Sequence, residues 1–196
     1  PTNGDAQTCG AISCTLCQVN VSADLSTGSG CSGSLRYCVA CTDAPIVNMT
    51  TSGTLDSPLT IQRDVSVFGN SHVISASISM PTLLSIESGI SGPILASVNG
   101  VNFVGTGLSI DHGIDLDEDA GTLELNGCAL QSFSSPIEGG ALKVGRNSAV
   151  ISSSSWFYLN TAVAGSAISI EEGGLYQGQS DQFTINIAGA GGGAVL

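Results

Sequence analysis

Two stretches near the end of the chain repeat each other 26 residues apart. Phe157 and Asn160 in "FYLN" are followed by Phe183 and Asn186 in "FTIN". A series of alanines, each preceded by Gly or Ser and followed by an aliphatic residue, recurs at intervals of 26 and 27 residues: Ala141, Ala167 and Ala194. Tandem copies of this length constrain the fold strongly, because each copy must form one unit that stacks on the next.

A period in the mid-twenties fits three short strands and three turns, which make one coil of a right-handed parallel β-helix. The Leu-x-x-Leu-x-Leu frame of a leucine-rich repeat is absent. Coils of a β-helix stack about 4.8 Å apart, so equivalent side chains form ladders. We therefore expect Phe over Phe in the interior and Asn bonded to Asn between turns. The predicted fold is all-β, with a single β-helix over 45–196 and a Cys-rich cap over 1–44.

Composition supports this fold and excludes several functions. Lys, Arg, Glu and Gln are sparse, and Gly and Pro interrupt the apolar stripes, so almost no helix is expected. The chain has 4 basic and 16 acidic residues, a formal net charge of -12. Such a chain does not suit nucleic-acid binding or an anionic membrane surface. No apolar run approaches the roughly 20 residues of a membrane span.

The cysteines gather near the start of the chain. Cys9, Cys14, Cys17, Cys31, Cys38 and Cys41 all precede residue 42, whereas Cys128 stands alone. The pairs "CTLC" and "CVAC" have the form of a zinc ribbon, which leaves Cys9 and Cys31 unused. Six cysteines also make three disulfide bridges, the interpretation we favour, although the spacing does not resolve the pairing. Cys128 is expected to be a small buried hydrophobic residue.

Two N-glycosylation sequons accompany the cysteines, "NVS" at Asn20 and "NMT" at Asn48. Together with the Ser/Thr/Gly-rich, Lys-poor composition, they indicate an extracellular or cell-surface protein that can carry N-linked glycans. The sequence begins with Pro1 and shows no signal peptide, so we expect a processed chain.

The alternation of "GGAL", "GSAI" and "GGAV" with "FYLN" and "FTIN" resembles the GGA-(I/L/V) and F-x-x-N repeats of the polymorphic outer-membrane protein and autotransporter passenger families. The resemblance covers roughly residues 133–196. It implies a right-handed parallel β-helix exposed at the cell surface and a role in adhesion. Upstream, "CSGSLRYCVAC" resembles the start of many secreted β-helix proteins, where a Cys-Ser-Leu-Arg segment caps the first coil.

Many β-helices are polysaccharide lyases or hydrolases, so the charged residues are candidate catalysts. A lyase needs a basic residue, and few are present. Arg36 is expected in the cap, and Lys143, which aligns with Ser169 of the next coil, is expected to be an outward surface residue. The acidic cluster "DHGIDLDED" (111–119) has three interpretations: a solvated turn, a metal site or a catalytic pair of Asp115 and Asp117 with His112. We favour the solvated turn.

No nucleophile elbow, zinc-protease helix or phosphate loop is present. We therefore predict no enzyme activity, no cofactor and no bound metal. Trp156 directly precedes an interior position, so alternation directs its side chain outward, where it can contact sugar or a partner subunit.

The last repeat stops at Leu196, inside a predicted strand. We expect a neighbouring copy to supply the rest of this coil, through an interface that includes Gly193, Ala194, Val195, Leu196 and Trp156. The predicted function is a structural subunit of an extracellular fibre or surface assembly that polymerises head-to-tail. An adhesin or passenger fragment is the alternative, and a polysaccharide lyase or hydrolase is the least favoured.

Overall fold

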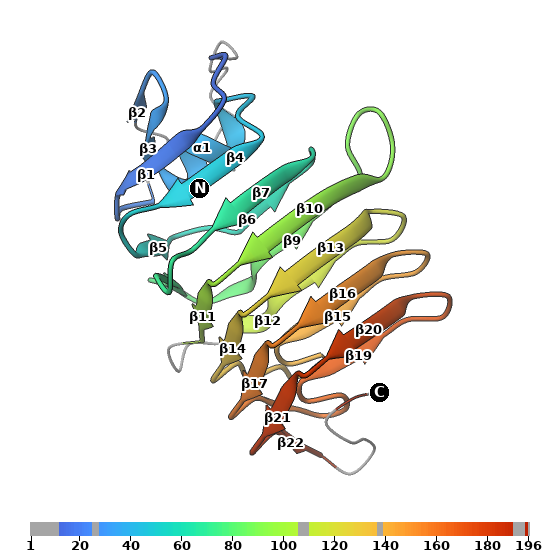
Figure 1. Ribbon diagram of the computed structural model, residues 1–196. Helices are drawn as coiled ribbons and strands as arrows, with labels where there is room; N and C mark the ends of the chain where they lie inside the picture. Colours follow the sequence, from blue (N-terminus) through green and yellow to red (C-terminus); the bar gives the residue numbers. More distant parts are fainter. Residues whose placement is uncertain (1–11, 25–27, 106–109, 137–138, 190–194, 196) are drawn as a thin grey trace.

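The computed structural model describes residues 12–24, 28–105, 110–136, 139–189 and 195. These residues wind into one parallel β-solenoid of about 6 turns, with coils of about 27 residues stacked on one another (Figure 1). The all-β fold class and the single solenoid are confirmed. The right-handed winding stays a prediction.

Three parallel sheets run along the solenoid, and each complete coil contributes one strand to each sheet. The nine-stranded sheet has the order β2-β3-β1-β4-β7-β10-β13-β16-β20, with only β2 antiparallel to its neighbour. Its strands are β1 (Cys17–Val21), β2 (Gly28–Ser29), β3 (Ser32–Ser34), β4 (Ile46–Met49), β7 (Val65–Phe68), β10 (Ile94–Asn99), β13 (Gly121–Asn126), β16 (Ala149–Ser153) and β20 (Leu175–Gln179).

The other two sheets form the remaining sides of the coil. The six-stranded sheet contains β5 (Gly53–Leu55), β8 (Val73–Ala76), β11 (Asn102–Val104), β14 (Ala129–Gln131), β17 (Trp156–Tyr158) and β21 (Gln182–Thr184). The five-stranded sheet contains β6 (Leu59–Ile61), β9 (Met80–Ile86), β12 (Ile110–Leu116), β15 (Leu142–Val144) and β19 (Ile168–Ile170). A short additional pair joins β18 (Thr161–Ala162) to β22 (Ile187–Ala188).

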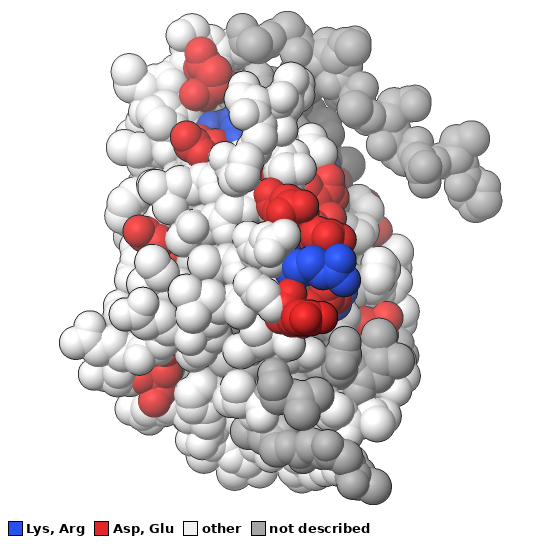
Figure 2. Space-filling view, turned by 90° about the vertical axis from the view of Figure 1, so that its right-hand side faces the viewer, with Lys and Arg blue, Asp and Glu red and all other residues white. Residues whose placement is uncertain are grey.

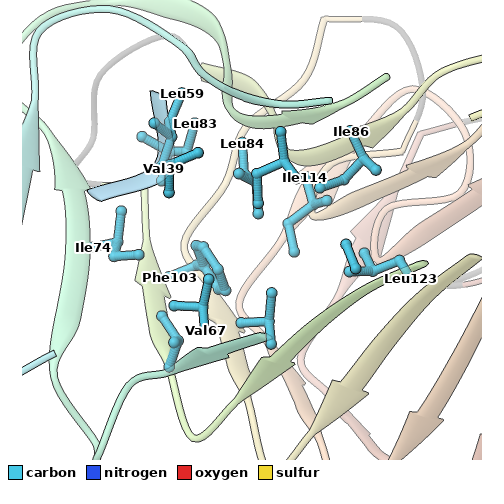
Figure 3. Packing of buried hydrophobic residues seen from close by; sticks show 14 of the residues in the cluster. Val39, Leu59, Val67, Ile74, Leu83, Leu84, Ile86, Phe103, Ile114 and Leu123 are labelled. Carbon is cyan, nitrogen blue, oxygen red and sulfur yellow. The ribbon is translucent and has the colours of Figure 1, made fainter. Parts of the chain in front are cut away.

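The core fills the inside of the coil, because successive side chains of a strand point to opposite faces. In β13, for example, Leu123 and Leu125 are fully buried, whereas Thr122 and Glu124 face outward. Equivalent inward positions of neighbouring coils stack, as Phe103, Leu130 and Phe157 do. Figure 3 shows apolar side chains from all three sheets meeting in this interior.

One corner of each coil repeats an unusual backbone conformation. Between the nine-stranded and six-stranded sheets, the chain turns at Gly100, Gly127, Ser154 and Ser180, with φ values of 61°, 60°, 53° and 60°. The left-handed conformation redirects the chain within two residues, so that the next strand joins the neighbouring sheet. Glycine adopts it without a steric penalty, whereas the two serines do so at some cost.

A six-residue helix covers the N-terminal end of the solenoid. In α1 (Leu35–Ala40) the side chain of Ser34 caps the helix by accepting a hydrogen bond from the Tyr37 amide. Leu35 and Val39 are buried, and α1 contacts β6 and β4. The near absence of helix is confirmed apart from this element, which forms on the segment that resembles a β-helix cap.

Disulfide bridges hold this cap together. Cys14 is bonded to Cys31 and Cys17 to Cys38, and Cys41 is also disulfide-bonded, while Cys9 lies outside the described residues. The disulfide interpretation is therefore confirmed for these cysteines. The zinc-ribbon alternative is wrong, because the thiols it would use are oxidised.

Two arginines attach the cap to the coils below it. Arg63, in the turn after β6, donates hydrogen bonds to the carbonyl oxygens of Cys38 and Val39 in the last turn of α1 and to that of Ala44. Arg36 of α1 donates to the carbonyl oxygens of Ser57 and Pro58, and within the cap it forms two bonds of 2.7 Å with the Asp24 carboxylate. The expectation that Arg36 belongs to the cap is confirmed, whereas the role of Arg63 was not predicted.

Candidate functional site

The last described coil presents the edges of its strands. β20, β21 and β19 each form one margin of their sheet. The Phe157 and Phe183 rings stack with centroids 4.9 Å apart and planes 7° apart, so the predicted phenylalanine ladder is confirmed. Phe157 is fully buried, whereas Phe183 is 39% exposed, because no further coil among the described residues covers it.

An asparagine ladder runs beside the phenylalanines. Nδ2 of Asn160 donates to Oδ1 of Asn186 at 2.9 Å and to the carbonyl of Leu130 at 3.0 Å. Oδ1 of Asn160 accepts from the amide of Phe133 at 3.1 Å. The predicted bonding between turns is confirmed, and it holds the backbone of three successive coils in register.

Of the five residues predicted for the subunit interface, the structure describes two, Val195 and Trp156. Val195 pairs with Ile168 as a parallel bridge and is 44% exposed. Gly193, Ala194 and Leu196 lie outside the described residues. Trp156 faces outward on β17 and is 41% exposed, as predicted.

Trp156 and Tyr158 form an aromatic pair on the outer face of the six-stranded sheet. Their ring centroids are 4.9 Å apart, with planes inclined by 31°. Nε1 of Trp156 donates to Oγ1 of Thr184 on the adjacent strand β21 at 3.3 Å. The sequence predicted that Trp156 faces outward. The same alternation along β17 puts Tyr158 on that face, but the aromatic pair itself was not predicted.

The outer faces of the sheets differ in charge. In the strands that the structure describes, the outward positions of the six-stranded sheet carry no charged side chain: Thr54, Val73, Ser75, Asn102, Val104, Ala129, Gln131, Trp156, Tyr158, Gln182 and Thr184. Acidic side chains instead surround basic ones on the side shown in Figure 2. The aromatic pair thus lies on a sheet face whose described outward positions are uncharged.

Lys143 lies at the centre of one charged group on the five-stranded sheet. It pairs with Ser169 in register, as predicted, and its Nζ lies 3.1 Å from Glu171 and 3.9 Å from Asp115. Burial alone would lower the pKa of Lys143, but the carboxylates of Asp115 and Glu171 raise it above its ordinary value. The same contact lowers the pKa of Glu171. Lys143 is therefore a charged ion-pair partner and is not poised to lose its proton as a base.

The acidic cluster does not converge on His112. Asp115 faces outward on β12 and the exposed Asp117 directly follows that strand, as predicted, whereas the His112 side chain is buried, with Nδ1 2.7 Å from the carbonyl oxygen of Gly139. Partial desolvation raises the pKa of Asp117, with smaller contributions from Asp115 and Glu87. In the part of the chain that the structure describes, no three His, Cys, Asp or Glu side chains gather as a metal site.

The two sequons lie near the N-terminal end of the nine-stranded sheet. Asn20 is exposed on β1. Asn48 is half-buried on β4, and its Oδ1 accepts a hydrogen bond from Asn70 at 2.8 Å. An exposed Asn20 is accessible to a glycosylating enzyme. At Asn48 the side chain is half-buried, which restricts access to Nδ2, the atom that carries an N-linked glycan, while its Oδ1 can keep the bond from Asn70. Glycosylation of either residue stays a prediction.

The oxidised cysteines favour an extracellular or otherwise oxidising location. Within the described ranges, no helix has the length and apolar character needed to cross a bilayer. No family model, curated protein or solved structure matches the chain. The similarity to outer-membrane and autotransporter passenger repeats therefore rests on the sequence motifs alone.

Proposed function

We propose that this chain is a non-enzymatic structural subunit of an extracellular assembly. In this proposal, copies polymerise head-to-tail, with the last coil of one copy joined to the N-terminal segment of the next. A contact between two different surfaces does not close on itself and therefore builds a filament. The proposed location outside the cell agrees with the disulfide-bonded cap.

The exposed edge of the last described coil is the observation that carries the proposal. Phe183 continues an interior column, yet it is 39% exposed, and Ile187 on β22 is 59% exposed. Among the strands that the structure describes, β21 pairs with β17 alone. An unpaired parallel edge beside uncovered apolar side chains is a template for another chain.

The two ends of the solenoid differ, which gives such a contact a direction. At the N-terminal end, α1 and the disulfide-bonded loops lie over the core, with Leu35 only 3% exposed. The last described coil has no helix over it among the residues described. A capped surface meeting an open edge favours head-to-tail contacts over symmetric pairing.

The hydrogen bonds and ion pairs of the basic residues support a role without catalysis. Arg63 and Arg36 bind the cap, Lys143 lies between two carboxylates, and Arg146 lies 3.3 Å from Glu118. Each basic side chain of the chain thus already has a structural or surface partner. Loss of polysaccharide turnover after Asp115→Asn and Asp117→Asn changes would instead support the enzyme alternative.

Intact-mass analysis of the native protein, combined with electron microscopy, tests the proposal. A natural C-terminus at or near Leu196 and visible fibres are the expected results. In solution, Phe183→Lys should reduce the concentration-dependent sedimentation of the purified chain, because it places a charge on the apolar edge. Ile151→Lys is the matched control, since Ile151 is 44% exposed on a sheet face instead of an edge.

An adhesin or autotransporter-like passenger fragment is the second candidate. It is favoured by the register of the last coils, which continues without interruption through Phe157 and Phe183. In that case, further coils of the same protein would cover the edge. Two results together would favour this candidate over the filament: a natural chain that continues through many more such coils, and no self-assembly of the purified protein.

A further inference from the structure

The sequence directs Trp156 outward, towards a partner subunit or a sugar, and the structure pairs it with Tyr158 on the outer face of a sheet and not on the edge of the last coil that carries the proposed contact. The two residues flank the buried Phe157 on the three-residue strand β17, and both face outward from the six-stranded sheet. The proposed contact instead lies at the end of the stack of coils, beyond β21 (Figure 1). An exposed tryptophan leaves apolar surface in contact with water, which is energetically unfavourable. An exposed aromatic pair is therefore typical of a binding surface.

We propose that Trp156 and Tyr158 form a binding platform for a neutral polysaccharide. The C–H groups on one face of a pyranose ring are weakly positive and stack on the negative face of an aromatic ring. With centroids 4.9 Å apart and planes inclined by 31°, the two rings stack partly on each other. The sugar would therefore stack on the remaining face of the more exposed ring, Trp156, which is 41% exposed, while the half-buried Tyr158 supports it from the other side. This site is additional to the proposed assembly edge and does not depend on it.

The neighbours of the pair provide room and hydrogen-bonding groups. Across the sheet from Trp156 lie Ala129 on β14 and Gln182 on β21. The small Ala129 side chain leaves the indole projecting above its strand. Tyr158 lies between Gln131 and Thr184 in the same way. Amide and hydroxyl groups on both sides of the rings can donate to and accept from sugar hydroxyls.

The distribution of charge selects a neutral ligand. The chain has a formal net charge of -12, yet the described strands of this sheet carry no charged side chain on their outer face. Asp181, which directly precedes β21, holds its carboxylate against the Tyr176 hydroxyl and the Ser155 amide, each at 2.7 Å. A polyanion such as a polyuronate would be repelled by the net charge and would find no basic partner here.

The hydrogen bond from Trp156 to Thr184 fixes the platform. With Nε1 held by Oγ1 at 3.3 Å, the indole is oriented before a ligand arrives. A ring that is ordered in advance loses little conformational entropy on binding. Thr184 is therefore a positioning residue, and Trp156 is the residue that touches the sugar.

The experiment uses the fluorescence of the tryptophan, because the chain contains only one. The protein is titrated with cellohexaose, xylohexaose, mannohexaose and laminarihexaose, and with hexagalacturonate as the acidic control. A saturable shift or quenching with at least one neutral oligosaccharide, and none with hexagalacturonate, is expected. No response to any neutral oligosaccharide, or a saturable response to hexagalacturonate, would overturn the proposal.

Calorimetry on variants separates direct contact from a structural effect. Trp156→Ala should weaken binding about tenfold or more, as expected for an aromatic hot spot, while Trp156→Phe should retain part of the affinity. Ile151→Ala, at a residue of similar exposure on the nine-stranded sheet, should leave binding unchanged. Unchanged affinity in a folded Trp156→Ala protein would contradict the proposal. So would a fluorescence shift on dilution without sugar, which would indicate that another copy covers Trp156.

Discussion

Asn160 and Asn186 repeat the same set of hydrogen bonds one coil apart. Nδ2 of Asn160 binds the carbonyl of Leu130 at 3.0 Å, and Nδ2 of Asn186 binds the carbonyl of Phe157 at 2.9 Å. Leu130 and Phe157 are themselves partners in adjacent strands. Oδ1 of Asn186 also accepts from the amide of Asn160 at 3.1 Å. Each asparagine thus satisfies backbone groups that a corner would otherwise leave buried without partners.

Asn160→Ala should strongly destabilise the solenoid. Asn160 is fully buried, and its removal leaves the amide of Phe133 and the carbonyl of Leu130 without their partner. We expect a loss of about 3 kcal/mol in the free energy of unfolding, measured by urea denaturation. Asn126→Ala is the control, because Asn126 makes its bonds on a half-exposed face where water can replace them. Equal losses in the two variants would contradict this role.

Gly127→Ala should destabilise the protein through the backbone alone. A Cβ at Gly127 meets nothing within 4 Å, but the residue has a φ of 60°. The left-handed conformation costs an L residue about 1 to 2 kcal/mol, and thermal unfolding should show a loss of this size. Gly53→Ala is the matched control, since its Cβ also meets open space and its φ is ordinary. A similar loss of stability in Gly53→Ala would contradict this explanation, because the loss could then not be attributed to the left-handed backbone conformation of Gly127.

The cap should depend on the buried bridge between Cys17 and Cys38. Both cysteines are fully buried, and replacing them together by serine should lower the free energy of unfolding by about 3 kcal/mol, measured by chemical denaturation.

Cys128 is a free thiol that is 2% exposed, and burial raises its pKa. It should react with a thiol reagent only after unfolding. Two reactive thiols in the native protein, or zinc that copurifies with it, would contradict this assignment.

Asp117→Asn should stabilise the protein at neutral pH. Desolvation, and then Asp115 and Glu87, raise the pKa of Asp117 above its value in the unfolded chain. The folded state therefore binds a proton more readily, so stability falls as the pH rises from the unfolded pKa through the folded one. Because Asp117 is exposed, the gain on removing its charge should stay below about 1 kcal/mol.

Thermal unfolding of Asp117→Asn at pH 4 and pH 7 provides the measurement. The difference from the parent protein should be larger at pH 7, where the carboxylate of Asp117 is ionised. Glu118→Gln removes a negative charge from the same turn and also takes a partner from Arg146. An equal gain in that control would attribute the effect to net charge and not to the position of Asp117.

The regular part of the fold could be predicted because its coils are nearly equal in length. Phe157 and Phe183 are 26 residues apart, and Leu130 precedes Phe157 by 27, so a simple comparison of the sequence with itself finds the ladder. Nearer the N-terminus the spacing varies: Val47 pairs with Val67, 20 residues on, and Val65 with Ala96, 31 residues on. A varying spacing hides the repeat, although the same sheets continue through it.

The sequence by itself determined the all-β solenoid and the two ladders, because these follow from residue types that recur at a nearly constant period, and the disulfide-bonded cap, because six cysteines gather within the first 41 residues. Only the tertiary structure decided which distant residues meet. It brought Arg63 to the end of α1, Lys143 between Asp115 and Glu171, and Tyr158 against Trp156 on an uncharged face. In a solenoid, neighbours on one face come from adjacent coils or alternate along a strand. Their contacts therefore depend on the exact register and on where each corner lies.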